Sequence, residues 1–248
     1  AETVTLSAGS SPAATNSLVC VPSCDLAFAD SGYLLTLANH QACTVPTFTI
    51  KAVKLSDTGV SCAPAYTGDQ SLDFVFDYAN PTSGTKVPNL AGTDMAAATV
   101  SQNRTVTFDN TGTANLSFQY DDAGQIRIDV SDAGGAGLSA ASVTTVVKPA
   151  KLIVASPDAN ADCVSGDANC SVFKKAGENF NLDVIAACSD NAVTPNYQQS
   201  NILLTLTEVA PNLGNSVSLG VSSVSLDASD NGSHRISNQS ISEEIGRA

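Results

Sequence analysis

The chain has 248 residues, a formal net charge of −13, and 43% hydrophobic residues; 5% of the chain is aromatic and none of it is Trp. This length suits about two domains of roughly 100–150 residues, and the apolar fraction excludes wholesale disorder. With 11 Lys and Arg against 24 Asp and Glu, the chain lacks the basic stripe that nucleic-acid binding requires. No run approaches the roughly 18 apolar residues of a membrane span, so membrane insertion is not expected.

Short runs of alternating apolar and polar residues follow one another along the chain. In the clearest, residues 72–78, every even-numbered residue is apolar and two of the others are acids. A period of two is typical of a strand with one face in a core. Similar runs predict strands at 47–53, 104–108, 114–120, 126–130, 143–147, 151–154, 180–185 and 202–206.

Turn-forming clusters, such as Asn80 to Gly84 and Asp109 to Gly112, separate these runs. No segment of 10–15 residues has a helical pattern. Many short strands with turn signals favour an all-β fold of tandem immunoglobulin-like antiparallel β-sandwiches.

A turn motif repeats at about the spacing of one sandwich. The pattern acid-x-Gly-x-apolar begins at Asp30 and Asp122, and an acid-x-Gly turn recurs at Glu244. It resembles the turn that enters strand F of immunoglobulin-like domains, where Gly permits the tight turn and the acid hydrogen-bonds locally. We therefore expect residues 1–39 to be the tail of a preceding unit or the first strands of the next, 40–148 to be a complete sandwich, and 149–248 to be a second sandwich that lacks its last strand.

The middle unit should have an apolar core between its two sheets, because the predicted strands each offer one apolar face. The side chains expected to meet there are Ile50, Phe74, Phe76, Leu116, Phe118, Ile126 and Ile128.

The cysteine spacing does not make a zinc site, and the only histidines, His40 and His234, lie in polar contexts where we expect exposed loops. Disulfides formed in an oxidising compartment are the better interpretation. The odd number leaves one thiol free or indicates a piece of a longer chain. The cysteines are Cys20, Cys24, Cys43, Cys62, Cys163, Cys170 and Cys188.

Local spacing suggests some of the pairings. Cys20 and Cys24 are close enough to close a small loop, and a bond between Cys43 and Cys62 would tie together the ends of the strand at 47–53. The three C-terminal cysteines allow a single bond among themselves, and the sequence does not choose the pair.

A calcium site is the most specific local hypothesis. Asp158, Asn160 and Asp162 supply the alternating oxygen ligands that open an EF-hand-like loop. The pattern then departs from that loop, with Cys163 at position six instead of Gly and Asn169 at position twelve instead of Glu. The alternative is a solvated turn in which Asp and Asn bind nearby backbone groups.

Enzymatic activity is not expected. The sequence contains neither Gly-x-Ser-x-Gly nor His-Glu-x-x-His. The adjacent acids Asp121 and Asp122 would be solvated at a turn rather than arranged for glycoside hydrolysis. We assign no catalytic and no cofactor-binding residue.

Several longer segments resemble the MshQ-like surface proteins of Gram-negative bacteria, which are associated with mannose-sensitive haemagglutinin type IV pili. The segments that carry the resemblance are residues 24–33, 43–53, 62–68, 78–85, 120–127, 172–180 and 193–197.

This resemblance implies an exported, extracellular segment at the cell surface of a Gram-negative bacterium, with a structural or adhesive role and no catalysis. Its partners would be other domains of the same surface protein or pilus components. The alternative is a module that itself binds a ligand, such as a glycan or a protein on a host or another surface, with calcium as an optional cofactor.

Overall fold

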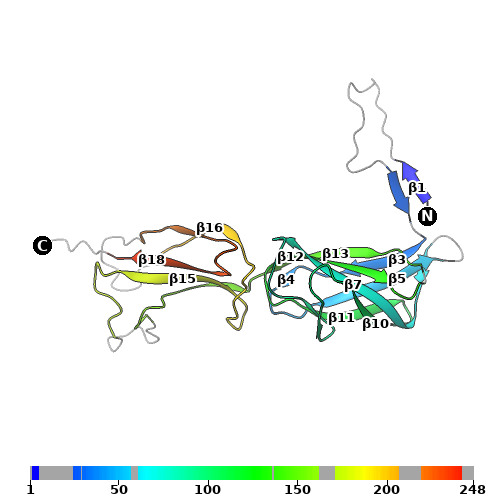
Figure 1. Cartoon of the computed structure of the whole chain (residues 1–248), viewed down its shortest axis with the longest axis horizontal. Helices are drawn as coiled ribbons and strands as arrows, with labels where there is room; N and C mark the ends of the chain where they lie inside the picture. The colour runs from blue at the N-terminus through cyan, green and yellow to red at the C-terminus, as the bar shows by residue number, and fades with distance from the viewer. Residues whose placement is uncertain are drawn as a thin grey trace, which may run out of the picture.

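The computed structural model describes residues 2–5, 25–28, 30–56, 61–135, 137–161, 171–206 and 219–241, the first two ranges only through their strand pairing. Within these ranges all regular secondary structure is β-strand. None of the described segments forms a helix with the length and hydrophobicity that crossing a membrane requires. Figure 1 shows two β-sandwiches placed end to end along the longest axis of the molecule.

The first sandwich is built on its longest strand, β7 (Gly68–Asn80), whose Leu72, Phe74 and Phe76 are completely buried. The neighbours of β7 are antiparallel, and the strand at one edge, β4, pairs in parallel with β13. The order in this five-stranded sheet is β10 (Gln102–Phe108), β7, β12 (Gly124–Asp132), β13 (Ala141–Lys148) and β4 (His40–Gln41).

The opposite sheet of this sandwich has five strands side by side, and a sixth, β6 (Cys62–Pro64), pairs with the end of β5 (Thr47–Leu55). The order is β3 (Ser31–Thr36), β5, β11 (Thr113–Gln119), β8 (Asn89–Leu90) and β9 (Thr93–Asp94). Residues 31–36 are thus a strand of this sandwich. A separate sheet of two strands is formed by β1 (Glu2–Thr5) and β2 (Asp25–Phe28).

The predicted core of the first sandwich is confirmed. Ile50, Phe74, Phe76, Phe118 and Ile128 are fully buried, Ile126 is 1% exposed, and Leu116 is half-buried against the same cluster. These side chains meet because strands of both sheets turn their apolar faces toward each other.

The second sandwich is smaller. Its three-stranded sheet contains β14 (Lys151–Ala155), β15 (Phe180–Ala187) and β18 (Ser233–Gln239), and its two-stranded sheet contains β16 (Gln199–Leu203) and β17 (Ser223–Leu226). Among its described residues, the main buried cluster contains Val184, Val224, Leu226 and Ile236. That residues 149–248 lack a last strand stays a prediction.

The predicted fold class is confirmed: the chain consists of tandem immunoglobulin-like antiparallel β-sandwiches. Each predicted run lies within a strand or extends one residue beyond it, except residues 202–206, of which β16 includes Ile202 and Leu203. The shortest strands, such as β4 and β8, carry too few residues for a period of two to be visible in the sequence.

Replacing Phe76 with Ala should lower the free energy of unfolding of the first sandwich by about 3–5 kcal/mol, because a fully buried aromatic ring is removed from between two sheets. Chemical denaturation with a spectroscopic probe measures this change. The matched control is Leu34→Ala on β3, whose side chain is 57% exposed and whose loss should be nearly neutral. Equal stability of Phe76→Ala and the parent chain would contradict the observed core.

Candidate functional site: the junction between the sandwiches

The chain crosses from one sandwich to the other through a single residue. The carbonyl of Lys148, the last residue of β13, accepts a hydrogen bond from Ala42 N in the first sandwich at 2.8 Å. Two residues later, Ala150 N donates to Ala187 O of the second sandwich at 2.9 Å. Pro149 alone lies between these bonds, and its ring fixes φ and favours extended backbone in the preceding residue. The linker therefore has little freedom to bend.

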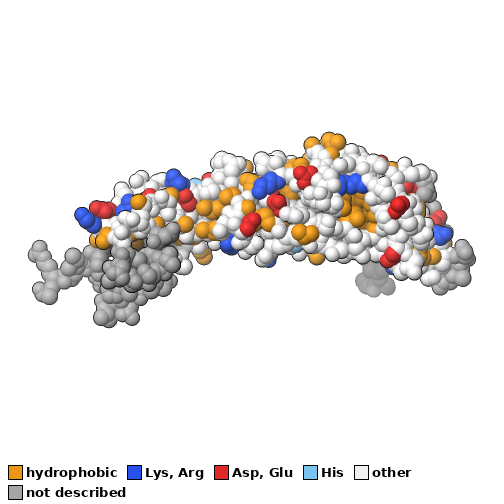
Figure 2. All heavy atoms as spheres, turned by 90° about the horizontal axis from the view of Figure 1, so that it is seen from below, with side chains coloured by type: hydrophobic (Ala, Val, Ile, Leu, Met, Phe, Trp, Pro, Cys, Tyr) orange, Lys and Arg blue, Asp and Glu red, His pale blue; other side chains and the backbone are white. Residues whose placement is uncertain are grey.

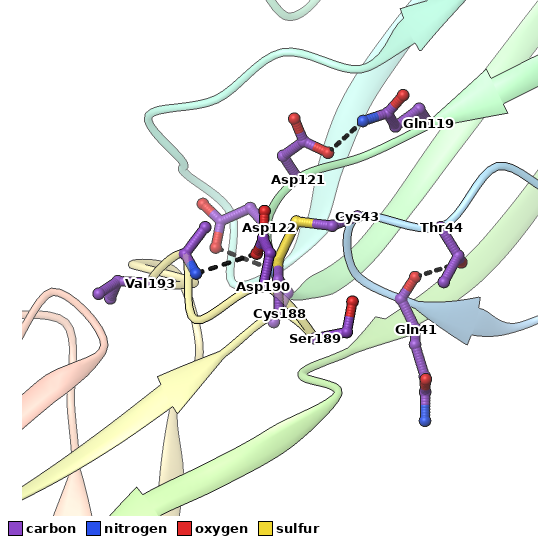
Figure 3. The surroundings of a disulfide bond; sticks show 12 residues. Gln41, Cys43, Thr44, Gln119, Asp121, Asp122, Cys188, Ser189, Asp190 and Val193 are labelled. Carbon is purple, nitrogen blue, oxygen red and sulfur yellow. Dashed lines mark hydrogen bonds between the residues drawn. A yellow bond between two sulfur atoms is a disulfide. The ribbon is translucent and has the colours of Figure 1, made fainter.

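A disulfide forms a second covalent connection across the junction. Cys43 follows β4 in the first sandwich and Cys188 follows β15 in the second, with their sulfur atoms 1.98 Å and their Cα atoms 5.8 Å apart (Figure 3). Cys188 is fully buried and belongs to the core cluster of the first sandwich. The two cysteines are separated by 145 residues in the sequence. In the chain-entropy model, closing a loop of this length lowers the entropy of the unfolded chain and stabilises the folded state by about 5 kcal/mol.

This bond corrects the predicted pairing of Cys43 with Cys62. Cys62 pairs with Leu55 at the end of β5, whereas Cys43 lies just before the beginning of that strand. Strand β5 separates the two by roughly 25 Å at its normal rise per residue, far beyond the 7 Å limit for Cα atoms joined by a disulfide. The thiol of Cys62 is free and exposed. The other predicted disulfide cysteines, Cys20, Cys24, Cys163 and Cys170, lie outside the described residues.

A buried carboxylate forms a third connection. Asp122 lies in the turn between β11 and β12 and is 0% exposed. Its Oδ1 accepts hydrogen bonds from Ala123 N, within the turn, and from Asn196 N in the second sandwich, both at 2.8 Å. The local bond is the one that the acid-x-Gly motif predicts. The bond to Asn196 is one that local sequence could not reveal.

The environment of Asp122 disfavours its charge. Burial raises the pKa of this carboxyl above its usual range, while the two backbone hydrogen bonds and the nearby Lys86 oppose that rise. Its Oδ2 is buried with no hydrogen-bond partner in the part of the chain that the structure describes. The prediction that Asp121 and Asp122 are both solvated is therefore wrong for Asp122, because the second sandwich covers the turn.

Lys86 links the same two surfaces through its ammonium group. Its Nζ donates to Asp121 O at 2.9 Å in the first sandwich and to Val193 O at 3.1 Å in the second. The backbone carbonyl of Lys86 accepts from the Tyr78 hydroxyl at 2.7 Å, which fixes the base of the side chain. The lysine thus joins backbone carbonyls of both sandwiches and brings a positive charge close to Asp122.

The two histidines were predicted in exposed loops, and the structure places both in strands. His40 lies in β4 and packs edge-on against Phe118, with ring centroids 5.7 Å apart, and burial lowers its pKa. His234 lies in β18, where its Nδ1 is 2.7 Å from Asp230 Oδ1. Strand β4 is too short, and strand β18 too polar, for an alternation of apolar and polar residues to predict them from the sequence.

The predicted calcium ligands are only partly described. The Asp158 carboxylate is occupied by Lys174 Nζ at 3.0 Å and by Asn181 Nδ2 at 3.1 Å, and the bond to Lys174 lowers its pKa. Asn160 adopts a left-handed turn conformation with φ of 61°. Asp162 lies outside the described residues. Calcium binding here stays a prediction, with a lysine already in contact with its first ligand.

Charges on one face of the molecule are mixed in sign. Figure 2 shows acidic and basic side chains interspersed along the face that it presents, with hydrophobic side chains between them. On this face the charges do not gather into one patch.

Two family profiles match the chain in succession. The first, described as the domain of unknown function DUF6701, first Ig-like domain, matches residues 13–148. The second, described as DUF6701, second domain, matches residues 148–239. The two matches meet at Lys148, the residue that precedes the one-residue linker. No curated protein matched the chain.

Solved structures of surface proteins share a distant similarity with the chain. The Yersinia pseudotuberculosis adhesin InvE is 16% identical, with 86% of this chain and 51% of that chain covered and a TM-score of 0.36. The D0–D1 domain of intimin is 17% identical, with 85% and 84% covered and a TM-score of 0.24. Domains 5–6 of the S-layer protein SbsC are 12% identical, with 88% of each chain covered and a TM-score of 0.25. The chain spans about half the length of the InvE chain.

The buried carboxylate predicts a pH dependence that Asp122→Asn should remove. Because folding raises the pKa of Asp122, the folded state binds its proton more tightly, so this group adds stability as the pH falls through the raised pKa toward 4 and withdraws it as the pH rises. The stability of Asp122→Asn relative to the parent chain should therefore increase from pH 4 to pH 7. Denaturant unfolding across this range measures the difference.

The companion variant Asp122→Ala should be less stable than Asp122→Asn at every pH, by about 1–3 kcal/mol, because two buried N–H groups lose their acceptor. A stability difference between Asp122→Asn and the parent chain that does not change with pH would show that the carboxyl is solvated in the folded protein.

Proposed function

From the premise that this chain belongs to the DUF6701 family, we propose that it is a rigid structural segment of an exported bacterial surface protein of the adhesin type. In this role the two sandwiches act as one stiff unit that holds other parts of the protein at a fixed distance and orientation. The segment carries load and performs no catalysis.

The observation that carries the proposal is the triple connection at the junction. A one-residue linker at Pro149, the disulfide between Cys43 and Cys188, and the hydrogen bonds of Asp122 and Lys86 all join the same two sandwiches. A single covalent link would leave rotation about its bonds free, as is usual between domains. Additional links at separate residues remove that freedom, which is the property that a spacer under load requires.

The proposed location outside the cell rests on the same disulfide and on charge. Structural disulfides persist in oxidising compartments and are rare in the cytosol. A net charge of −13 keeps an extended protein soluble and away from anionic envelope surfaces. Both features favour the surface of an exported protein.

The finer assignment follows the sequence resemblance. We place the segment among the MshQ-like proteins of Gram-negative bacteria, with other domains of the same protein or pilus components as its partners. The second candidate function, a module that binds a ligand itself, is favoured by a cleft beside the junction, which is treated separately below.

Small-angle X-ray scattering of the parent chain should give an elongated particle whose profile fits one arrangement of the two sandwiches. The double variant Cys43→Ser/Cys188→Ser should need a range of interdomain angles to fit its profile, because one of the two covalent links is gone. The matched control is Cys62→Ser, which removes the exposed thiol far from the junction and should leave the profile unchanged. A parent profile that itself requires a broad range of angles would refute the proposed rigidity.

A further inference from the structure

A cleft with a volume of about 290 Å³ opens beside the junction, and its walls come from both sandwiches. The first sandwich contributes the end of β7 at Asn80, the beginning of β12 at Gly124 and Gln125, and the end of β13. The second sandwich contributes Asn196 and the two residues that follow it. Clefts between domains are where ligand sites most often form.

The polar groups of this cleft are mainly amides. Asn80 and Gln125 face it from the first sandwich, and Asn196 and Gln198 from the second, beside the ring of Tyr197. Each amide offers both N–H donors and a carbonyl acceptor, and tyrosine offers an apolar ring with a hydroxyl. Among the described residues, no protein group is hydrogen-bonded to the side chains of Asn80, Gln125 or Gln198, so they remain available to a ligand.

The walls are held in place before any ligand arrives. Gly124 has φ of 137°, and a Cβ built there would lie 3.1 Å from Asn80 O and 3.4 Å from Asn196 Nδ2. Glycine thus permits the close approach of the two walls. The backbone of Asn196 is bound to Asp122, and the disulfide fixes the second sandwich against the first. A preformed site spends little binding free energy on ordering its own groups.

The chemistry of the lining indicates the kind of ligand. A sugar hydroxyl is a donor and an acceptor at once, and paired amides satisfy both functions. Among the described residues, the lining has one charged side chain, Lys148, in a chain with a net charge of −13, so amides rather than charges dominate the cleft. We propose that this cleft binds a terminal unit of a neutral oligosaccharide. This inference deepens the second candidate function above by naming its ligand class, and it rests on the fixed junction for the shape of the cleft.

The experiment is binding of the whole two-sandwich chain to an array of neutral and acidic oligosaccharides, followed by titration calorimetry with the best neutral one. The double variant Gln125→Ala/Gln198→Ala should bind it about tenfold more weakly, since each substitution removes hydrogen bonds to the sugar. The control is Gln70→Ala, which lies on β7 at the end opposite Asn80 and should bind like the parent chain. Cys43→Ser/Cys188→Ser should also bind more weakly, because its walls are no longer fixed.

Absence of binding to any neutral oligosaccharide, binding confined to acidic ones, or equal affinity of the double variant and the parent chain would each overturn the assignment. The variant Gln125→Ala/Gln198→Ala should give the same scattering profile as the parent chain, because neither residue takes part in the connections between the sandwiches. Failure of the binding site and failure of the proposed rigidity are therefore distinguishable.

Discussion

The arrangement of the whole molecule depends on how little chain separates its two sandwiches. Hydrogen bonds fix Lys148 to one domain and Ala150 to the other, so the only residue between them is a proline with a restricted backbone. A linker of this kind brings the turn of Asp122 and the loop of Asn196 into contact. The disulfide, the buried carboxylate and the lysine bridge join these same surfaces.

The polar contacts at the junction contribute orientation more than stability. A hydrogen bond from a backbone N–H to a charged acceptor is worth about 1.5–3 kcal/mol, but the desolvation of Asp122 offsets much of that gain. The positive charge of Lys86 and the N–H of Ala123 compensate for part of that cost within the first sandwich, whereas the N–H of Asn196 does so only when the second sandwich is in place. The covalent links then hold the domains close enough for this position to be selected.

Local pattern accounts for what could be predicted. Alternation in residues 72–78 predicts both the strand β7 and its buried face, because the side-chain period of a strand is a backbone property. The acid-x-Gly motif likewise predicts the turn at Asp122 and its bond to Ala123 N. Each of these features is decided by residues a few positions apart.

What the sequence does not reveal is set by contacts between distant residues. Spacing alone favours Cys43 with Cys62, yet the length of β5 places them at opposite ends of a strand, and the true partner of Cys43 is 145 residues away. The sequence predicts a solvated acid at Asp122, because the residues that bury it belong to the second sandwich. The cleft is invisible for the same reason: Gln125 and Gln198 become neighbours only when the second sandwich docks.

Stiffness and recognition are linked in this architecture through the same contacts. Asn196 belongs to the cleft by its side chain and to the junction by its backbone N–H, which Asp122 accepts. Gly124 stands at the same boundary, between the turn that bears Asp122 and the wall that bears Gln125. A change of angle between the sandwiches would therefore separate the amides of one wall from those of the other. Fixing the domains for a mechanical role would, without any added element, keep the cleft between them in a single shape.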